Sequence, residues 1–186
     1  MRRLLRTAVP LSAFLISIGG CGGVRQNTPF GWLALGPAPS TWSPAGTVSG
    51  GALPRPPGWR QERGDKGSVS FVELGHHGAV SGYLNATPRS GGERLENWTR
   101  FRPTHNAQEG DRQVRTLSGA DELRVRTARA SCVVDQYSTR LSAYRELACL
   151  IDDARGSTVV LGAAPPERWA AELPVIERAI AGFVAG

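Results

Sequence analysis

The sequence predicts an α+β fold in which an antiparallel meander sheet is flanked by helices. Short segments with alternating apolar and polar residues recur between residues 68 and 163, a pattern typical of half-buried strands. Most connections between these segments are too short for the crossovers that parallel strands need. The C-terminal segment instead has apolar residues at helical spacing. We therefore expect one domain over residues 59–186, a length sufficient for a single compact core.

The first predicted element is a β-hairpin. The segments SVSFVEL (68–74) and AVSGYLNA (79–86) both have strand character. The sequence GHHG (75–78) lies between them and fits a turn. Two antiparallel neighbours are therefore expected here.

A capped helix is predicted to follow. Ser90 and Glu93 have the spacing of a capping box, in which the hydroxyl and the carboxylate satisfy backbone N–H groups at the start of a helix. The apolar side of this helix should carry Leu95, Trp98 and Phe101. Residues 103–111 are expected to form a loop.

The second half of the chain predicts further strands and a C-terminal helical region. The expected strands are residues 113–117, 122–127, 132–138, 144–151 and 157–163. Apolar residues then recur at alternating spacings of four and three, at Trp169, Leu173, Ile176, Ile180 and Phe183. Because proline disrupts a helix interior, we expect a short first helix and a second helix with Pro174 in its opening turn.

The N-terminus has the features of an export signal. Arg2, Arg3 and Arg6 precede the apolar residues 8–18, which span only about 16 Å as a helix, too short for a permanent membrane span. The segment IGGC (18–21) resembles the lipobox of bacterial lipoproteins, in which the cysteine receives a diacylglyceryl group. We therefore expect a signal peptide over residues 1–20 and a lipid anchor on Cys21, at the extracytoplasmic face of a bacterial cell membrane. An ordinary signal peptide with a chance cysteine, or twin-arginine export, is the alternative.

Residues 21–58 are predicted to be the lipidated N-terminus and a flexible linker. The segment is rich in Gly, Pro, Ser and Thr and has no apolar periodicity. As a coil it would separate the domain from the membrane by roughly 30 to 36 Å. Four apolar side chains that are unusual in such a linker could lie on the membrane, dock on the domain or contact a partner: Trp32, Leu33, Leu35 and Trp42.

The remaining two cysteines predict the register of one hairpin. With Cys21 acylated, Cys132 and Cys149 can pair in an oxidising compartment. If the bond joins opposed positions of antiparallel strands, the turn is centred on residues 140 and 141, and closing the loop contributes roughly 3 kcal/mol. Val134 and Leu147 then share the cysteine face and belong to the core.

The same register places two carboxylates opposite each other on the other face. Asp135 would oppose Glu146, and Tyr137 would oppose Tyr144. Opposed carboxylates repel, so charge pairing with an arginine should relieve them. The arginines expected to do so are Arg124, Arg126, Arg140 and Arg145. The alternative is a carboxylate pair with split pKa values, as in acid/base catalysis or cation binding. The possible binding face comprises Asp135, Tyr137, Arg140, Tyr144 and Glu146.

Composition and motifs favour a non-enzymatic protein. Beyond the first 20 residues the chain has 19 Lys and Arg against 16 Asp and Glu, and its arginines are scattered, so no nucleic-acid partner is expected. There is no nucleophile elbow, P-loop, dinucleotide-binding glycine pattern or paired C-x-x-C zinc site, so no cofactor or metal is expected. Two alternatives remain: an envelope hydrolase or cation-dependent enzyme using Asp135 and Glu146, and a redox role for Cys132 and Cys149.

Several segments resemble the PsbP-like proteins, which include actinobacterial lipoproteins of the LpqN type. They are PPGW (56–59), YRELAC (144–149), VVLGAAP (159–165), Trp169 and PVIERAIAGF (174–183), within residues 56–185. This resemblance implies an α/β/α sandwich. It also implies a binding or assembly module without catalytic residues. Together with the predicted lipid anchor and spacer, we expect a membrane-tethered factor whose partner is an envelope protein, a cell-wall component or a lipid.

Overall fold

A computed structural model of the chain describes residues 30–46 and 51–185. The predicted signal peptide (1–20) and the predicted lipidation site, Cys21, lie outside the described residues. Within the described ranges, no helix is both long and apolar enough to cross a bilayer.

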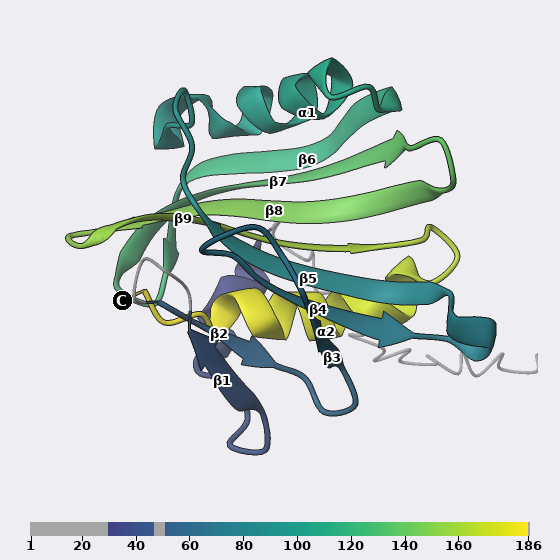
Figure 1. The fold of residues 1–186 in the computed structure, drawn as a ribbon. Helices are drawn as coiled ribbons and strands as arrows, with labels where there is room; N and C mark the ends of the chain where they lie inside the picture. The colour runs from purple at the N-terminus through teal and green to yellow at the C-terminus, as the bar shows by residue number, and fades with distance from the viewer. Residues whose placement is uncertain (1–29, 47–50, 186) are drawn as a thin grey trace, which may run out of the picture.

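A seven-stranded antiparallel sheet forms the centre of the fold (Figure 1). Its strand order is β3-β4-β5-β9-β8-β7-β6. These strands are β3 (Arg60–Glu62), β4 (Val69–Leu74), β5 (Val80–Pro88), β6 (Arg112–Val125), β7 (Ala128–Ser138), β8 (Ala143–Asp153) and β9 (Gly156–Ala164). A separate two-stranded sheet pairs β1 (Ser43–Gly46) with β2 (Ala52–Arg55). Short 3-10 helices are η1 (Gly31–Leu35), η2 (His76–Gly78) and η3 (Leu95–Asn97).

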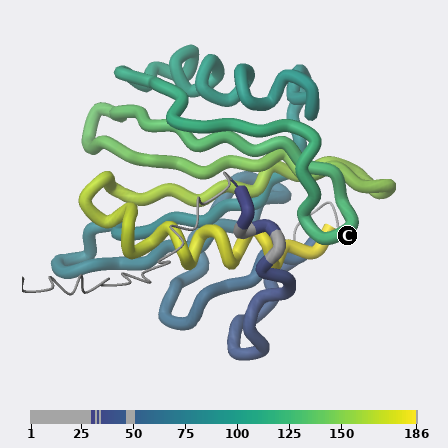
Figure 2. Tube along the Cα trace, turned by 180° about the vertical axis from the view of Figure 1, so that it is seen from behind, coloured from purple at the N-terminus to yellow at the C-terminus, as the bar shows by residue number. Residues whose placement is uncertain are grey.

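Two helices cover opposite faces of the large sheet, so the predicted layered α+β architecture is confirmed (Figures 1 and 2). Helix α1 (Trp98–Gln108) packs over β6, β7 and β8, and α2 (Trp169–Ala181) packs over β9, β5 and β8. Each helix covers its own apolar cluster. Beneath α1 lies the fully buried Trp98, whose indole N–H donates to the Ala148 carbonyl at 3.0 Å. The larger cluster, which includes both cysteines of the β7–β8 pair, lies beneath α2.

Helix α2 approaches the sheet closely at a glycine. A Cβ on Gly162 of β9 would lie 2.5 Å from Cγ2 of Ile176 and 3.0 Å from Cδ2 of Leu84. No side chain fits between the strand and the helix there, so the absence of a Cβ sets the distance of α2 from β9.

The expectation of a flexible linker is wrong for the part of it that the structure describes, residues 30–46 and 51–58. Phe30 and Leu53 are buried in the larger cluster, and Leu33 and Trp42 pack against it. Residues 30–46 and 51–58 are called here the N-terminal strap. Because η1 contacts α2, the strap covers the outer side of this helix. Of the apolar side chains that looked unusual in a linker, Leu33 and Trp42 bury surface here, whereas Leu35 is exposed. The burial of Phe30, Leu33, Trp42 and Leu53 favours an ordered segment despite its Gly and Pro content.

Three predicted element boundaries are also wrong. The two strands expected between residues 113 and 127 are one bulged strand, β6, whose extra residues are absorbed by register shifts, with Gln113 and Glu122 at positive φ. Helix α1 continues past Pro103 to Gln108, because side chains on its inner face contact the sheet beyond the proline. Helix α2 is continuous through Pro174, which lies on its exposed side.

The predicted hairpins have the expected partners. Strands β4 and β5 pair antiparallel across the η2 turn, with a bulge at Glu73/Leu74. Glu93 accepts the Ser90 backbone N–H at 2.6 Å, which is one half of the predicted capping box, and a helical segment begins at Leu95. Leu95, Trp98 and Phe101 all belong to the cluster beneath α1.

Replacing Gly162 with alanine should lower the free energy of unfolding by about 1–3 kcal/mol, because the new Cβ must displace α2 from β9. Gly91→Ala serves as the control, since a Cβ at Gly91 would meet no atom within 4 Å. Urea denaturation followed by tryptophan fluorescence measures both variants. Equal stability of the two would contradict the close packing described above.

Candidate functional site

The Cys132–Cys149 disulfide is present and has the predicted register. The two cysteines are directly opposed on β7 and β8, with a Cα–Cα distance of 4.1 Å. The pairs Val134–Leu147, Asp135–Glu146 and Tyr137–Tyr144 follow from it. Both cysteines are fully buried beneath α2, so an exchanging thiol has no access and the bond is structural.

On the opposite face, the paired carboxylates lie beneath α1. The side chains of Asp135 and Glu146 are 0% and 1% exposed. Arg102 of α1 binds Glu146 with two hydrogen bonds, from Nε to Oε1 at 2.7 Å and from Nη2 to Oε2 at 2.9 Å. The Tyr137 hydroxyl donates to Oε2 of Glu146 at 3.3 Å. Glu146 is therefore held in a buried, bidentate ion pair.

Asp135 is held by a neutral partner instead. Asn106 Nδ2 donates to its Oδ2 at 3.2 Å, and its Oδ1 is buried without a hydrogen-bond partner among the described residues. Burial and, secondarily, the charge of Glu146 raise the pKa of Asp135 to about 8. Arg102 opposes this effect, and Asp111 adds to it. Asp135 is thus predominantly protonated at neutral pH.

The residues that relieve the carboxylate pair are not the predicted ones. Arg145 hydrogen-bonds Gln136, and Arg124 hydrogen-bonds the Thr127 carbonyl. Arg126 and Arg140 are exposed. Arg102 relieves the pair instead, and Asn106 assists it. With Trp98, these two residues recur every four positions on one helical face, a signal that is visible only when the helix is extended past Pro103.

The five residues of the predicted binding face separate into two groups. Asp135, Tyr137 and Glu146 lie together beneath α1. Burial, and after it Glu146, raise the pKa of Tyr137 well above its ordinary value, so its hydroxyl keeps its proton. Tyr144 packs against Tyr137 with ring centroids 6.0 Å apart, while Arg140 lies in the exposed β7–β8 turn.

Tyr144 also lines a hollow of about 980 Å³ at the end of the sheet, called here the loop-end hollow. The β4–β5 turn, the β7–β8 turn and the β9–α2 connection meet around it, through His76, Leu141, Pro165 and Pro166. Leu141 at the turn tip is 94% exposed, and Val80 on the opposite rim is also exposed. Leu141 and Val80 therefore add exposed apolar surface to this hollow.

A second carboxylate pair lies at this hollow and was missed by the sequence analysis. Arg168 Nη2 is 2.7 Å from Oε1 of Glu172 and 3.9 Å from Oε2 of Glu73. Ser81 donates to Glu73 at 2.5 Å. Burial is the main cause of a raised pKa for Glu172. These residues fix the start of α2 against β4 and β5, and the sequence offers no signal that Glu73 and Glu172 meet.

Solved structures show the same fold at low sequence identity. The solution structure of PsbP (CyanoP) from Synechocystis sp. PCC 6803 is 16% identical, with a TM-score of 0.56, and the match covers 91% of this chain and 99% of that one. A protein of unknown function, PA94 from Pseudomonas aeruginosa, is 10% identical, with a TM-score of 0.50 and coverage of 75% and 94%. LpqN of Mycobacterium tuberculosis, described as involved in cell envelope biogenesis, is 14% identical, with a TM-score of 0.46 and coverage of 77% and 84%. Neither a family model nor a curated protein matches the chain. The predicted PsbP-like fold is therefore confirmed as a likeness of fold.

Removing the arginine of the buried ion pair should be strongly destabilising. Arg102→Gln leaves the charge of Glu146 buried and unpaired, so the free energy of unfolding should fall by about 3–5 kcal/mol. The double variant Arg102→Gln/Glu146→Gln should lose less than the single variant, because no charge is left unpaired. Urea denaturation provides both values. Arg100→Gln, on the exposed side of α1, is the control and should change stability by no more than about 0.5 kcal/mol.

The raised pKa of Asp135 predicts a pH dependence of stability. Between about pH 4 and pH 8 the unfolded chain ionises this carboxyl while the folded chain keeps it protonated, so the free energy of unfolding should fall as pH rises. The contribution is at most about 1.4 kcal/mol per pH unit. Asp135→Asn should remove this slope, whereas the exposed control Asp65→Asn should retain it. Denaturation series at several pH values measure the slope, and an unchanged slope in Asp135→Asn would refute the assignment.

Proposed function

We propose that this chain is a lipid-anchored lipoprotein on the extracytoplasmic face of a bacterial cell membrane, where it acts as a non-enzymatic binding or assembly factor of the envelope. The anchor is a diacylglyceryl group on Cys21. It is supported by the basic and apolar leader and by the IGGC segment. A disulfide between Cys132 and Cys149 is in keeping with an oxidising compartment.

The burial of the carboxylate pair is the observation that carries the non-enzymatic assignment. A catalytic group must touch its substrate, yet Asp135 and Glu146 are covered by α1 and bound by its side chains. A hydrolase using this pair would have to displace the helix and separate Arg102 from Glu146. The pair therefore serves to fix α1 on the sheet.

The loop-end hollow is the surface proposed to bind the partner. It is formed by three connections on a rigid antiparallel sheet, an arrangement that commonly carries binding residues. The exposed Leu141 and Val80 provide apolar contact area, and Glu167 and Arg168 provide charged groups on the rim. An envelope protein with an apolar patch of its own is the partner that this chemistry favours.

The start of the ordered body limits how far the protein can reach from the membrane. Nine residue steps separate Cys21 from Phe30, which is buried against the core. A fully extended chain of that length spans at most about 30 Å. The anchor therefore holds Phe30 within about 30 Å of the membrane surface.

A combined acylation and crosslinking experiment in the native host tests the proposal. A photoreactive amino acid is placed at Leu141 or, as a control, at the exposed Arg63, in chains with Cys21 or with Cys21→Ala. We expect a clickable fatty acid to label the Cys21 chain and not the Cys21→Ala chain. We also expect a discrete protein adduct from position 141 that is absent from position 63 and weaker without Cys21.

Each part of the proposal can fail separately. An unlabelled, uncleaved Cys21 chain would remove the lipid anchor. Identical adducts from positions 141 and 63 would show that the loop-end hollow does not select a partner, even if the chain is acylated.

A further inference from the structure

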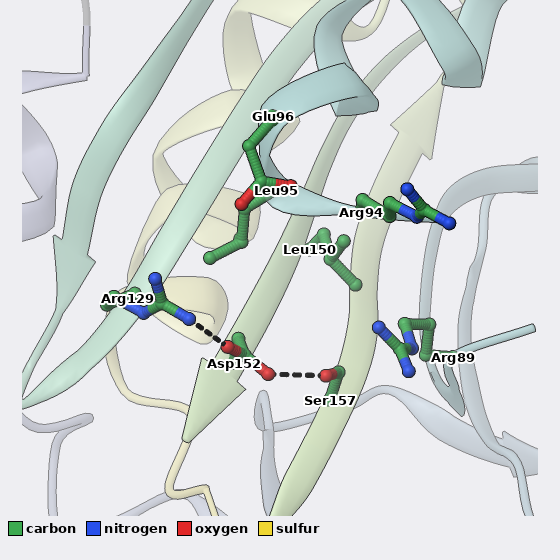
Figure 3. A pocket seen from close by; sticks show the side chains of 8 residues that line it. All are labelled: Arg89, Arg94, Leu95, Glu96, Arg129, Leu150, Asp152 and Ser157. Atoms are coloured by element: carbon green, nitrogen blue, oxygen red, sulfur yellow. Dashed lines mark hydrogen bonds and ion pairs between the residues drawn. The ribbon is translucent and has the colours of Figure 1, made fainter. Parts of the chain in front are cut away.

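A second hollow lies at the other end of the large sheet, on the face that α1 covers. Its charged side chains have no part in the proposed function. It measures about 230 Å³ and is called here the arginine hollow. Figure 3 shows Arg89 and Arg94 on one side of it and Arg129 on the other, with Glu96 at its upper end and Asp152 and Ser157 at its lower end. Leu95 and Leu150 supply its apolar surface.

Hydrogen bonds fix the backbone at Arg89 and Arg94, whose side chains are exposed. Arg89 directly follows β5, and its N–H donates to the Ser157 carbonyl at the start of β9 at 3.0 Å. Arg94 directly precedes η3, where its own N–H donates to Asn97 at 2.9 Å. The two arginines therefore project from short, hydrogen-bonded segments and not from a free loop.

One of the three guanidinium groups already has a carboxylate partner. Arg129 donates to Oδ2 of Asp152 at 2.7 Å, and Ser157 donates to Oδ1 of the same carboxylate at 2.5 Å. Both oxygens of Asp152 are thus occupied, and this carboxylate balances Arg129.

Arg89 and Arg94 have no such partner among the described residues. Neither forms an ion pair with any described carboxylate. The only hydrogen bond that the Arg89 side chain forms with a described residue is at 3.4 Å, to the backbone carbonyl of Glu93. The carboxylate of Glu93 is itself buried and accepts the Ser90 N–H. Three guanidinium groups therefore line one small hollow together with two carboxylates, Asp152 and the exposed Glu96, and no ion pair joins Arg89 or Arg94 to either carboxylate.

We propose that the arginine hollow binds a phosphate group through Arg89 and Arg94. Guanidinium groups bind the oxygens of phosphate monoesters and diesters with paired, charge-assisted hydrogen bonds. The volume exceeds that of a few water molecules, so a small organic group attached to the phosphate can rest on Leu95 and Leu150. The phosphate can come from a soluble ester or from a phospholipid headgroup. This binding does not depend on acylation of Cys21 or on the loop-end hollow.

The test is a phosphate titration of the ¹⁵N-labelled full-length chain in detergent, followed by NMR at constant ionic strength. Inorganic phosphate should cause saturable shifts at the amides of Arg89, Leu95 and Ser157. Arg89→Gln/Arg94→Gln should weaken binding by at least about tenfold, since it removes two charge-assisted interactions. The matched control, Arg63→Gln/Arg100→Gln, removes the same charge from exposed positions elsewhere and should stay within about twofold.

Phosphatidylglycerol and phosphatidylcholine in mixed micelles distinguish the two sources. Phosphatidylglycerol binding more tightly than inorganic phosphate identifies a lipid headgroup, whereas equal or weaker binding identifies a soluble phosphate compound. Shifts that never saturate, or an equal loss of affinity in both double variants, would show a general charge effect and overturn the proposal. Thermal unfolding of each variant confirms that it is folded before the titration is interpreted.

Discussion

The ion pair between Arg102 and Glu146 is the interaction on which the α1 side of this fold depends. Two carboxylates opposed across a sheet can be buried only if something compensates their charge. Arg102 compensates one of them, and a shifted proton equilibrium neutralises the other. Both effects require α1 to lie where it does. The position of the helix and the burial of the acidic pair therefore depend on each other. The apolar contacts of Trp98 alone would fix neither the rotation nor the position of the helix so closely.

The sequence predicts the β7–β8 hairpin well because one covalent constraint fixes it. Once Cys132 and Cys149 are opposed, the two-residue period of strands assigns every neighbouring pair to a face, including Asp135 and Glu146. The partners of those carboxylates were not predictable in the same way. Arg102 lies 44 residues from Glu146 and next to a proline that usually ends a helix. Tertiary contacts with the sheet override that local preference.

The N-terminal strap was missed for a different reason. Its composition resembles that of a disordered segment. An average composition does not reveal the few apolar side chains that make the strap pack on the domain. Phe30 and Leu53 are buried in the cluster that also contains the apolar residues of α2, and the spacing of those residues does not reveal that a second segment packs on the helix. The strap packs on α2 through a few separate apolar side chains, so its sequence shows no periodic pattern that would predict this contact.

The strap also connects the two ends of the folded body. Ala52 exchanges backbone hydrogen bonds with Val184, with N···O distances of 2.7 and 3.0 Å, while Phe30 and η1 pack near α2. A pulling force applied at the N-terminus is therefore carried first by the strap and the outer side of the C-terminal helix. The edge strand β3 follows the strap in the chain, so it is loaded only after the strap is released. The first resistance to pulling is thus set by the contacts of the strap with α2 and by its hydrogen bonds to Val184.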